Sequence, residues 1–124
     1  KDGIYAATLL VEMLSVTGKK MSALMREIYD EFGTAYMTER DWPFDEETKQ
    51  RLNTLLMVDK KLPDFPVPVK SVNYMDGCKV YFKNGGWVIA RFSGTEPLLR
   101  VFCEMDTMEN AEKIAKILTE FLSL

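Results

Sequence analysis

The sequence predicts an α+β fold: a four-stranded, mainly antiparallel sheet covered by a C-terminal helix (ββββα), preceded by an N-terminal helical hairpin and a third helix. Apolar residues recur at helical spacing as far as Gly33, and they alternate with polar residues after Val69. Two turn-forming pairs, Asp76-Gly77 and Asn84-Gly85, lie between β-rich segments and indicate tight hairpins. An amphipathic segment after these strands predicts the covering helix.

The composition bounds the class of protein. At 124 residues, 47% of them hydrophobic, the chain can form a compact unit with a modest core. Sixteen basic and nineteen acidic residues leave a net charge of −3 without a basic tract, so nucleic acid and anionic membranes are not expected partners. No segment has the roughly 20 apolar residues of a membrane span, and the charged start is unlike a signal peptide. A cytoplasmic location is therefore expected.

Residues 1–33 are predicted to form the helical hairpin. Gly18 supplies a stop after the first helix, and Gly33 ends the second. The apolar stripes of the two helices are Ile4, Ala7, Val11 and Leu14, and then Met21, Leu24, Met25, Ile28 and Phe32. These stripes are expected to be partly exposed, or to pack on the rest of the chain or on a second copy of it.

Residues 34–68 are predicted to be a connector with one helix. A short extended piece is expected at 35–38, and Pro43 stops any helix that would run through it. Asp45 is the expected N-cap of the third helix, which has an acidic first turn and a buried side formed by Leu52, Leu55 and Leu56. Three prolines, at 63, 66 and 68, stiffen the approach to the last domain.

Residues 69–124 are predicted to form that last domain. Strands are expected near 69–75, 78–83, 86–92 and 99–105, and their tight connections make them antiparallel. Asp106, followed three residues later by Glu109, is the expected start of the closing helix. The inner face of this helix is predicted to contain Ala111, Ile114, Leu118 and Phe121.

The two cysteines, Cys78 and Cys103, are predicted to be buried thiols inside strands. They are too far apart for a C-x-x-C motif, and the chain has no histidine to complete a zinc site. A disulfide would form only if the strands placed them together. The acidic run 45–47 lacks the alternating spacing that brings carboxylates onto one cation, so no metal site is expected.

The chemistry of the chain is concentrated in residues 91–100, the string R-F-S-G-T-E-P-L-L-R. The guanidinium groups of Arg91 and Arg100 match phosphate oxygens in pairs, and the hydroxyls of Ser93 and Thr95 can donate to the oxygens left over. Gly94 can take a positive φ and let the backbone N–H groups form an anion nest. These five residues are the predicted phosphate-binding set.

The segment has two alternative interpretations, a simple surface turn and a loop with a nucleophilic serine. An ordinary Ser/Gly/Thr turn with two surface arginines is the simpler alternative, but it does not explain why arginines bracket the turn on both sides. Ser93 is disfavoured as a nucleophile because no histidine can act as its base, although a lysine could substitute. Glu96 would repel a phosphate, so a supporting role is expected in which it orients Arg91 or Arg100, or pairs with another domain.

The string at 91–100 resembles the phosphate-binding loop in the last domain of the α-D-phosphohexomutases, the phosphoglucomutase/phosphomannomutase superfamily. The resemblance extends upstream through Asp76-Gly77, 79–82 and 86–90, and downstream through 101–104. The opening residues 1–7 are similar to the end of the preceding, third domain of that family. The resemblance therefore implies that 1–33 closes that third domain and that 69–124 is the C-terminal domain.

The resemblance implies the last part of an isomerase of carbohydrate metabolism that interconverts hexose 1-phosphate and hexose 6-phosphate through a bisphosphorylated sugar. In the family, a phosphoserine loop and a Mg²⁺ site of the Asp-x-Asp-x-Asp kind lie upstream, and neither string occurs here. The chain alone is thus expected to be inactive, with no catalytic residue and no cofactor of its own. Its expected partners are a phosphosugar and the upstream domains.

The preferred sugar and the function of the chain each have an alternative. Phe92 and the pair Leu98-Leu99 favour the glucose/mannose mutases over the glucosamine type. The alternative function is a non-catalytic module that binds a phosphate ligand or another protein.

Overall fold

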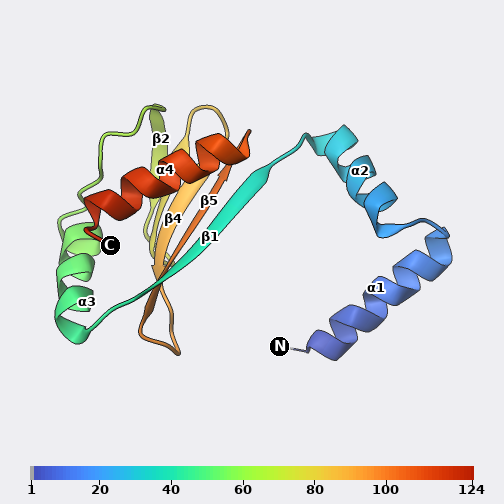
Figure 1. Ribbon diagram of the computed structural model, residues 1–124, viewed down its shortest axis with the longest axis horizontal. Coiled ribbons are helices and arrows are strands. Elements are labelled where there is room, and N and C mark those ends of the chain that lie inside the picture. Colours follow the sequence, from blue (N-terminus) through green and yellow to red (C-terminus); the bar gives the residue numbers. More distant parts are fainter. Residues whose placement is uncertain (1) are drawn as a thin grey trace. The chain divides into compact units, whose positions relative to one another are not determined.

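The computed structural model describes residues 2–124. These residues form two compact units, and the boundary between them lies between Thr34 and Ala35 (Figure 1). The first unit holds two helices, and the second holds a sheet with its covering helices.

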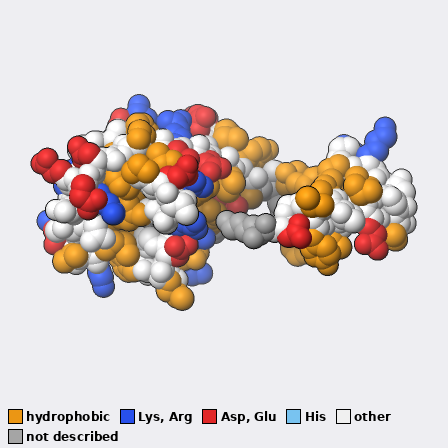
Figure 2. Space-filling model, turned by 90° about the horizontal axis from the view of Figure 1, so that it is seen from below, with side chains coloured by type: hydrophobic (Ala, Val, Ile, Leu, Met, Phe, Trp, Pro, Cys, Tyr) orange, Lys and Arg blue, Asp and Glu red, His pale blue; other side chains and the backbone are white. Residues whose placement is uncertain are grey.

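The first unit consists of α1 (Gly3–Thr17) and α2 (Met21–Phe32), as expected. Asp2 caps α1 by accepting a hydrogen bond from the backbone N–H of Tyr5 at 2.9 Å, and Gly18 ends it in the left-handed conformation with φ 64°. The helices diverge from the turn, and neither buries a residue within the described structure (Figure 1). Ile4 is 83% exposed and Val16 is 79% exposed, and Figure 2 shows hydrophobic side chains over much of this unit.

The second unit contains a five-stranded sheet in the order β1-β5-β4-β3-β2, in which every neighbouring pair is antiparallel. The strands are β1 (Tyr36–Pro43), β2 (Val69–Asn73), β3 (Cys78–Phe82), β4 (Trp87–Phe92) and β5 (Leu98–Met105). The α+β class and the four expected strands are confirmed, with ends within two residues of those predicted.

The expected number of strands was wrong by one, because β1 is a full edge strand. All eight of its residues pair with β5, from Tyr36 opposite Met105 to Pro43 opposite Leu98. The run Glu39-Arg40-Asp41 lies in its middle, and charged residues are typical of edge strands because they discourage pairing with another chain. Those charges hide the alternation that identifies a half-buried strand.

The remaining helices are α3 (Glu46–Asn53), which continues into the π-helical turn η1 (Thr54–Val58), and α4 (Met108–Phe121). Asp45 caps α3 as expected: its carboxylate accepts from the backbone N–H of Thr48 at 2.8 Å, and this bond lowers the pKa of Asp45. The cap of α4 is Thr107 and not Asp106, which instead accepts from the side chain of Asn110 at 2.8 Å.

The core lies between the sheet and its helices. Alternate residues of β3, β4 and β5 are buried on the face that α4 covers (Figure 1), and the residues between them lie on the opposite, open face. The buried set includes Val80, Phe82, Val88, Leu99, Val101, Ile114 and Leu118, together with Leu52 and Leu56 from the α3–η1 segment. Among the helices of residues 2–124, none is both long enough and apolar enough to cross a membrane.

Both cysteines are buried free thiols, as predicted. They lie on β3 and β5, and β4 separates these strands in the sheet: Cys78 faces Ala90 and Cys103 faces Val88. Burial raises the pKa of Cys78 to about 11 and that of Cys103 to about 12.

Candidate phosphate-binding site

The candidate site is built around the hairpin loop 93–97 between β4 and β5. The backbone N–H of Ser93 donates to the carbonyl of Leu98 at 2.8 Å, and the N–H of Leu98 donates to the carbonyl of Glu96 at 2.8 Å. The N–H of Phe44 donates to the carbonyl of Pro97 at 3.1 Å, which fastens the loop to the chain that leaves β1. The loop is therefore held at its base and at its exit.

Three consecutive backbone donors of this loop are free for a ligand. Within residues 2–124, no acceptor lies in hydrogen-bonding position for the N–H groups of Gly94, Thr95 and Glu96, and all three residues are exposed. Gly94 does not adopt the positive φ that a glycine can take. A Cβ at this position would meet no atom within 4 Å, so the glycine leaves open space in front of the loop. That space allows close approach of an anion to the backbone.

The two predicted arginines lie side by side. Arg91 on β4 is the register partner of Arg100 on β5, and both project from the open face of the sheet because their neighbours Ala90 and Val101 are buried. Like charges at directly opposite positions destabilise a sheet. A bound anion would convert this unfavourable pair into a binding feature.

Carboxylates accompany both guanidinium groups. Arg91 Nη1 lies 2.9 Å from Asp76 Oδ2, and Arg100 Nη2 lies 3.1 Å from Glu96 Oε2. Arg100 Nε is 3.9 Å from Asp41 Oδ1, a distance beyond a hydrogen bond, and it is a buried donor without a partner among residues 2–124. A buried donor left unpaired costs about 1–3 kcal/mol.

A hollow of about 250 Å³ lies beside the loop. Its walls are the whole loop, 93–97, and four residues around the start of α3: Phe44, Asp45, Glu46 and Lys49. The arginines do not line this hollow; Arg91 lines a second one, of about 340 Å³, on the open face of the sheet. The hollow therefore brings Ser93, Gly94, Thr95 and Glu96 together, and the strand register brings Arg91 beside Arg100. Glu96, which lines the hollow, contacts Arg100 and so connects the two groups.

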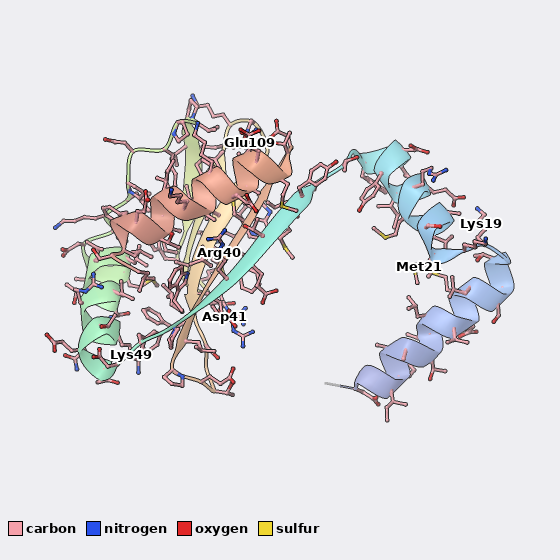
Figure 3. All side chains as sticks on the ribbon, viewed as in Figure 1. Lys19, Met21, Arg40, Asp41, Lys49 and Glu109 are labelled. Carbon is pink, nitrogen blue, oxygen red and sulfur yellow. The ribbon has the colours of Figure 1, made fainter. Side chains whose placement is uncertain are left out.

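Three residues near the site were not predicted for it. Lys49 lies on α3 and Asp41 lies on β1 (Figure 3). Both elements are far from the hairpin in sequence, so no local motif could have indicated these two residues. Lys49 Nζ lies 3.6 Å from Glu46 Oε2. Asp76 had a signal, because Asp76-Gly77 was recognised as a hairpin turn, but its pairing with Arg91 depends on the fold.

The acidic side chains near the hairpin are paired with cations. Residues 2–124 contain no group of three His, Cys, Asp or Glu side chains that could hold a metal ion. The nearby acidic side chains already have cationic neighbours: Asp76 with Arg91, Glu96 with Arg100, and Glu46 with Lys49. The hydroxyls, backbone N–H groups and guanidinium groups of the hairpin are hydrogen-bond donors of the kind that bind anions.

The fold and this loop define an α+β domain with a candidate anion-binding hairpin, and comparison with known proteins gives its family. The family model described as "Phosphoglucomutase/phosphomannomutase, C-terminal domain" matches residues 47–121. The chain belongs to this family, within the α-D-phosphohexomutase superfamily, as the resemblance of the loop indicated.

Several curated relatives are similar over nearly all of the chain. A probable phosphoglucosamine mutase of Methanosarcina acetivorans is 39% identical over 121 residues, which is 93% of this chain and 25% of the relative. A probable phosphoglucosamine mutase of Pyrococcus furiosus is 33% identical, over 93% of this chain and 24% of the relative. A phosphoglucomutase/phosphomannomutase of Thermococcus kodakarensis is 29% identical, over 94% and 23%. The chain thus spans about a quarter of the length of these relatives.

Proposed function

We propose that this chain supplies the phosphate-binding domain of a phosphohexomutase, and that its ligand is the phosphate group of a hexose phosphate. The observation that carries the proposal is the placement of Arg91 opposite Arg100 at the base of a loop with three free backbone N–H groups. Ser93, Gly94, Thr95 and the two arginines are the proposed donors. Glu96, within 3.1 Å of Arg100, has the supporting role of orienting that guanidinium.

The proposed task of the loop is positional. The reaction would interconvert hexose 1-phosphate and hexose 6-phosphate, and a serine in the upstream part of the polypeptide would exchange the phosphoryl group with the sugar. The loop would hold the phosphate that is not reacting, and this would place the other end of the sugar at that serine. The binding energy of the remote phosphate would then contribute to orienting the reacting group.

A loop with this task accepts the sugar in two opposite orientations. It must therefore recognise phosphate and not the sugar ring, so the choice among glucose, mannose and glucosamine phosphates is proposed to lie outside the loop. The names of the relatives agree with this separation, since two are probable phosphoglucosamine mutases and one is a phosphoglucomutase/phosphomannomutase.

The Mg²⁺ ion of the family does not fit the described residues around the hairpin. Mg²⁺ needs several oxygen ligands in near-octahedral geometry, and the carboxylates of Glu46, Asp76 and Glu96 are each paired with a Lys or Arg side chain. We assign the metal, like the serine, to the upstream part of the polypeptide. A cytoplasmic location remains a prediction of the sequence.

The substitution Arg100→Ala in the full-length protein tests the proposal. Each charge-assisted hydrogen bond to phosphate contributes about 1.5–3 kcal/mol, so kcat/KM for the hexose phosphate should fall by about 10-fold to 100-fold. Phosphorylation of the catalytic serine should stay largely intact, because Arg100 would not contact it. The control is Arg40→Ala, an arginine of the same sheet whose alternation places it on the other face. An unchanged kcat/KM in Arg100→Ala would contradict the assignment.

A further inference from the structure

We infer that Asp76 is a positioning residue: it holds the guanidinium of Arg91 in the orientation that receives the phosphate. The inference rests on the proposed function of the loop. Asp76 lies in the turn between β2 and β3, not in the phosphate loop, and its carboxylate oxygen Oδ2 lies 2.9 Å from Arg91 Nη1. It approaches the site from a different hairpin.

The turn that carries Asp76 is pressed against the backbone of Arg91. Gly77 has φ 92°, and a Cβ on it would lie 2.5 Å from the carbonyl oxygen of Ala90 and 2.9 Å from the Cα of Arg91. Such distances exclude any side chain at this position. Because Gly77 has no side chain, the turn can lie directly beside Arg91, the residue that Asp76 contacts.

The turn is also ordered from its other end. The side-chain oxygen of Asn73 accepts a hydrogen bond from the backbone N–H of Met75 at 2.8 Å, an Asx turn at the exit of β2. Asp76 is thus placed by a hydrogen bond on one side and by close backbone contact on the other.

The neighbouring cation does not compete for Asp76. Lys79 lines the same hollow of about 340 Å³, but its ammonium lies 3.8 Å from the centre of the Trp87 ring, a cation–π contact. Asp76 engages Nη1 of Arg91, and a guanidinium has five N–H donors. The carboxylate can therefore fix the plane of the group and leave other donors for a phosphate.

Positioning can be separated from a structural role because this ion pair is exposed. The Arg91 side chain is 43% exposed and that of Asp76 is 73% exposed, and ion pairs of this kind add little to stability. Loss of Asp76 should leave the melting temperature nearly unchanged. It should allow the Arg91 side chain to adopt more rotamers. Phosphate binding must then order this side chain, which lowers the affinity by about threefold to tenfold.

Simple electrostatics predicts the opposite sign. A negative charge near a phosphate repels it, so neutralising Asp76 would strengthen binding if the residue were only a nearby charge. Positioning predicts weaker binding from the same substitution. The direction of the change in affinity therefore decides between the two roles.

The test compares Asp76→Asn with Asp76→Glu, which keeps the charge and its reach to Arg91. The control is Asp59→Asn, which removes the carboxylate of another exposed ion pair, with Lys61 at 3.1 Å. The first measurement needs no ligand: the NMR order parameter of the Arg91 Nε–H should fall in Asp76→Asn, stay near the original in Asp76→Glu, and be unaffected in Asp59→Asn.

The second measurement is the KM for glucose 1-phosphate and glucosamine 1-phosphate in the full-length protein. Asp76→Asn should raise KM by about threefold to tenfold with partial rescue in Asp76→Glu. An unchanged order parameter, or a lower KM, in Asp76→Asn would overturn the inference. If Arg91→Ala also leaves KM unchanged, the proposed function fails as well; if only Asp76→Asn is silent, the positioning role alone is wrong.

Discussion

Two arginines occupy facing positions on neighbouring strands, where a sheet more often places opposite charges. The sequence indicated both, because they bracket a Ser-Gly-Thr turn, and it indicated that both would point to one place. The register of β4 and β5 puts Arg91 opposite Arg100. That both guanidinium groups bind one phosphate stays a prediction. The sequence could not indicate the carboxylates Asp76 and Asp41, because they reach the arginines only through strand pairing.

The two glycines of these hairpins should respond differently to substitution. Gly77→Ala places a Cβ against the carbonyl oxygen of Ala90 at a positive φ, and strain of this kind should lower the free energy of unfolding by about 2 kcal/mol or more. Gly94→Ala meets open space without a positive φ, so its effect should stay within about 1 kcal/mol. Urea unfolding of both variants measures the difference, and equal destabilisation would show that the Gly77 turn can shift without strain.

The two buried thiols should give the protein a characteristic loss of stability at alkaline pH. In the unfolded chain a thiol loses its proton near pH 9.0, whereas burial raises the pKa in the folded protein to about 11 for Cys78 and about 12 for Cys103. The folded state therefore binds more protons above pH 9, and its stability falls as the pH rises toward these values. The double variant Cys78→Ala/Cys103→Ala should show a shallower decline in unfolding free energy over this range. An identical decline in both proteins would assign it to other groups.

At the scale of elements, the most accurate predictions of helix and strand positions came from sequence patterns that are compatible with a single type of element. The alternation after Val69 and the turns Asp76-Gly77 and Asn84-Gly85 predicted the ends of β2 to β4 to within two residues. Two adjacent cap-forming residues, Asp106 and Thr107, explain the error of one residue at α4, since either can begin a helix. β1 was expected only as a short extended piece at 35–38, because an edge strand with charges in its middle has no clear alternation.

The edge strand β1 should be necessary for the stability of the sheet. It pairs with β5 along eight residues, although the family match begins only at residue 47. Residues 35–124 form a compact unit and should fold as a fragment. A fragment of residues 45–124 would expose the hydrogen-bonding edge of β5, so it should melt at a lower temperature and associate. Circular dichroism and light scattering of the two fragments provide the comparison, and equal melting temperatures would show that β1 is dispensable.

The residues that surround the site are determined by the fold of the whole molecule more than by the motif at 91–100. The loop 93–97 shares its hollow with the first turn of α3, about fifty residues earlier in the sequence, and Lys49 enters the site only by this route. The motif itself was sufficient to identify the family, because its residue types and spacing are contiguous. The surroundings that tune a phosphate site depend on how the chain folds.

At the scale of the whole molecule, we expect this chain to bind a hexose phosphate without catalysing its conversion. The described residues provide guanidinium, hydroxyl and backbone donors around the loop, and no cluster of carboxylates for a metal. The 124-residue chain should therefore bind glucose 6-phosphate without converting it to glucose 1-phosphate, because holding a spectator phosphate does not move a phosphoryl group. Calorimetric titration and a coupled mutase assay on the same preparation measure the two properties, with Arg91→Ala as the variant that should lose binding. Turnover by the purified chain would contradict this division of labour, and it would place a phosphoryl acceptor among the residues of this chain.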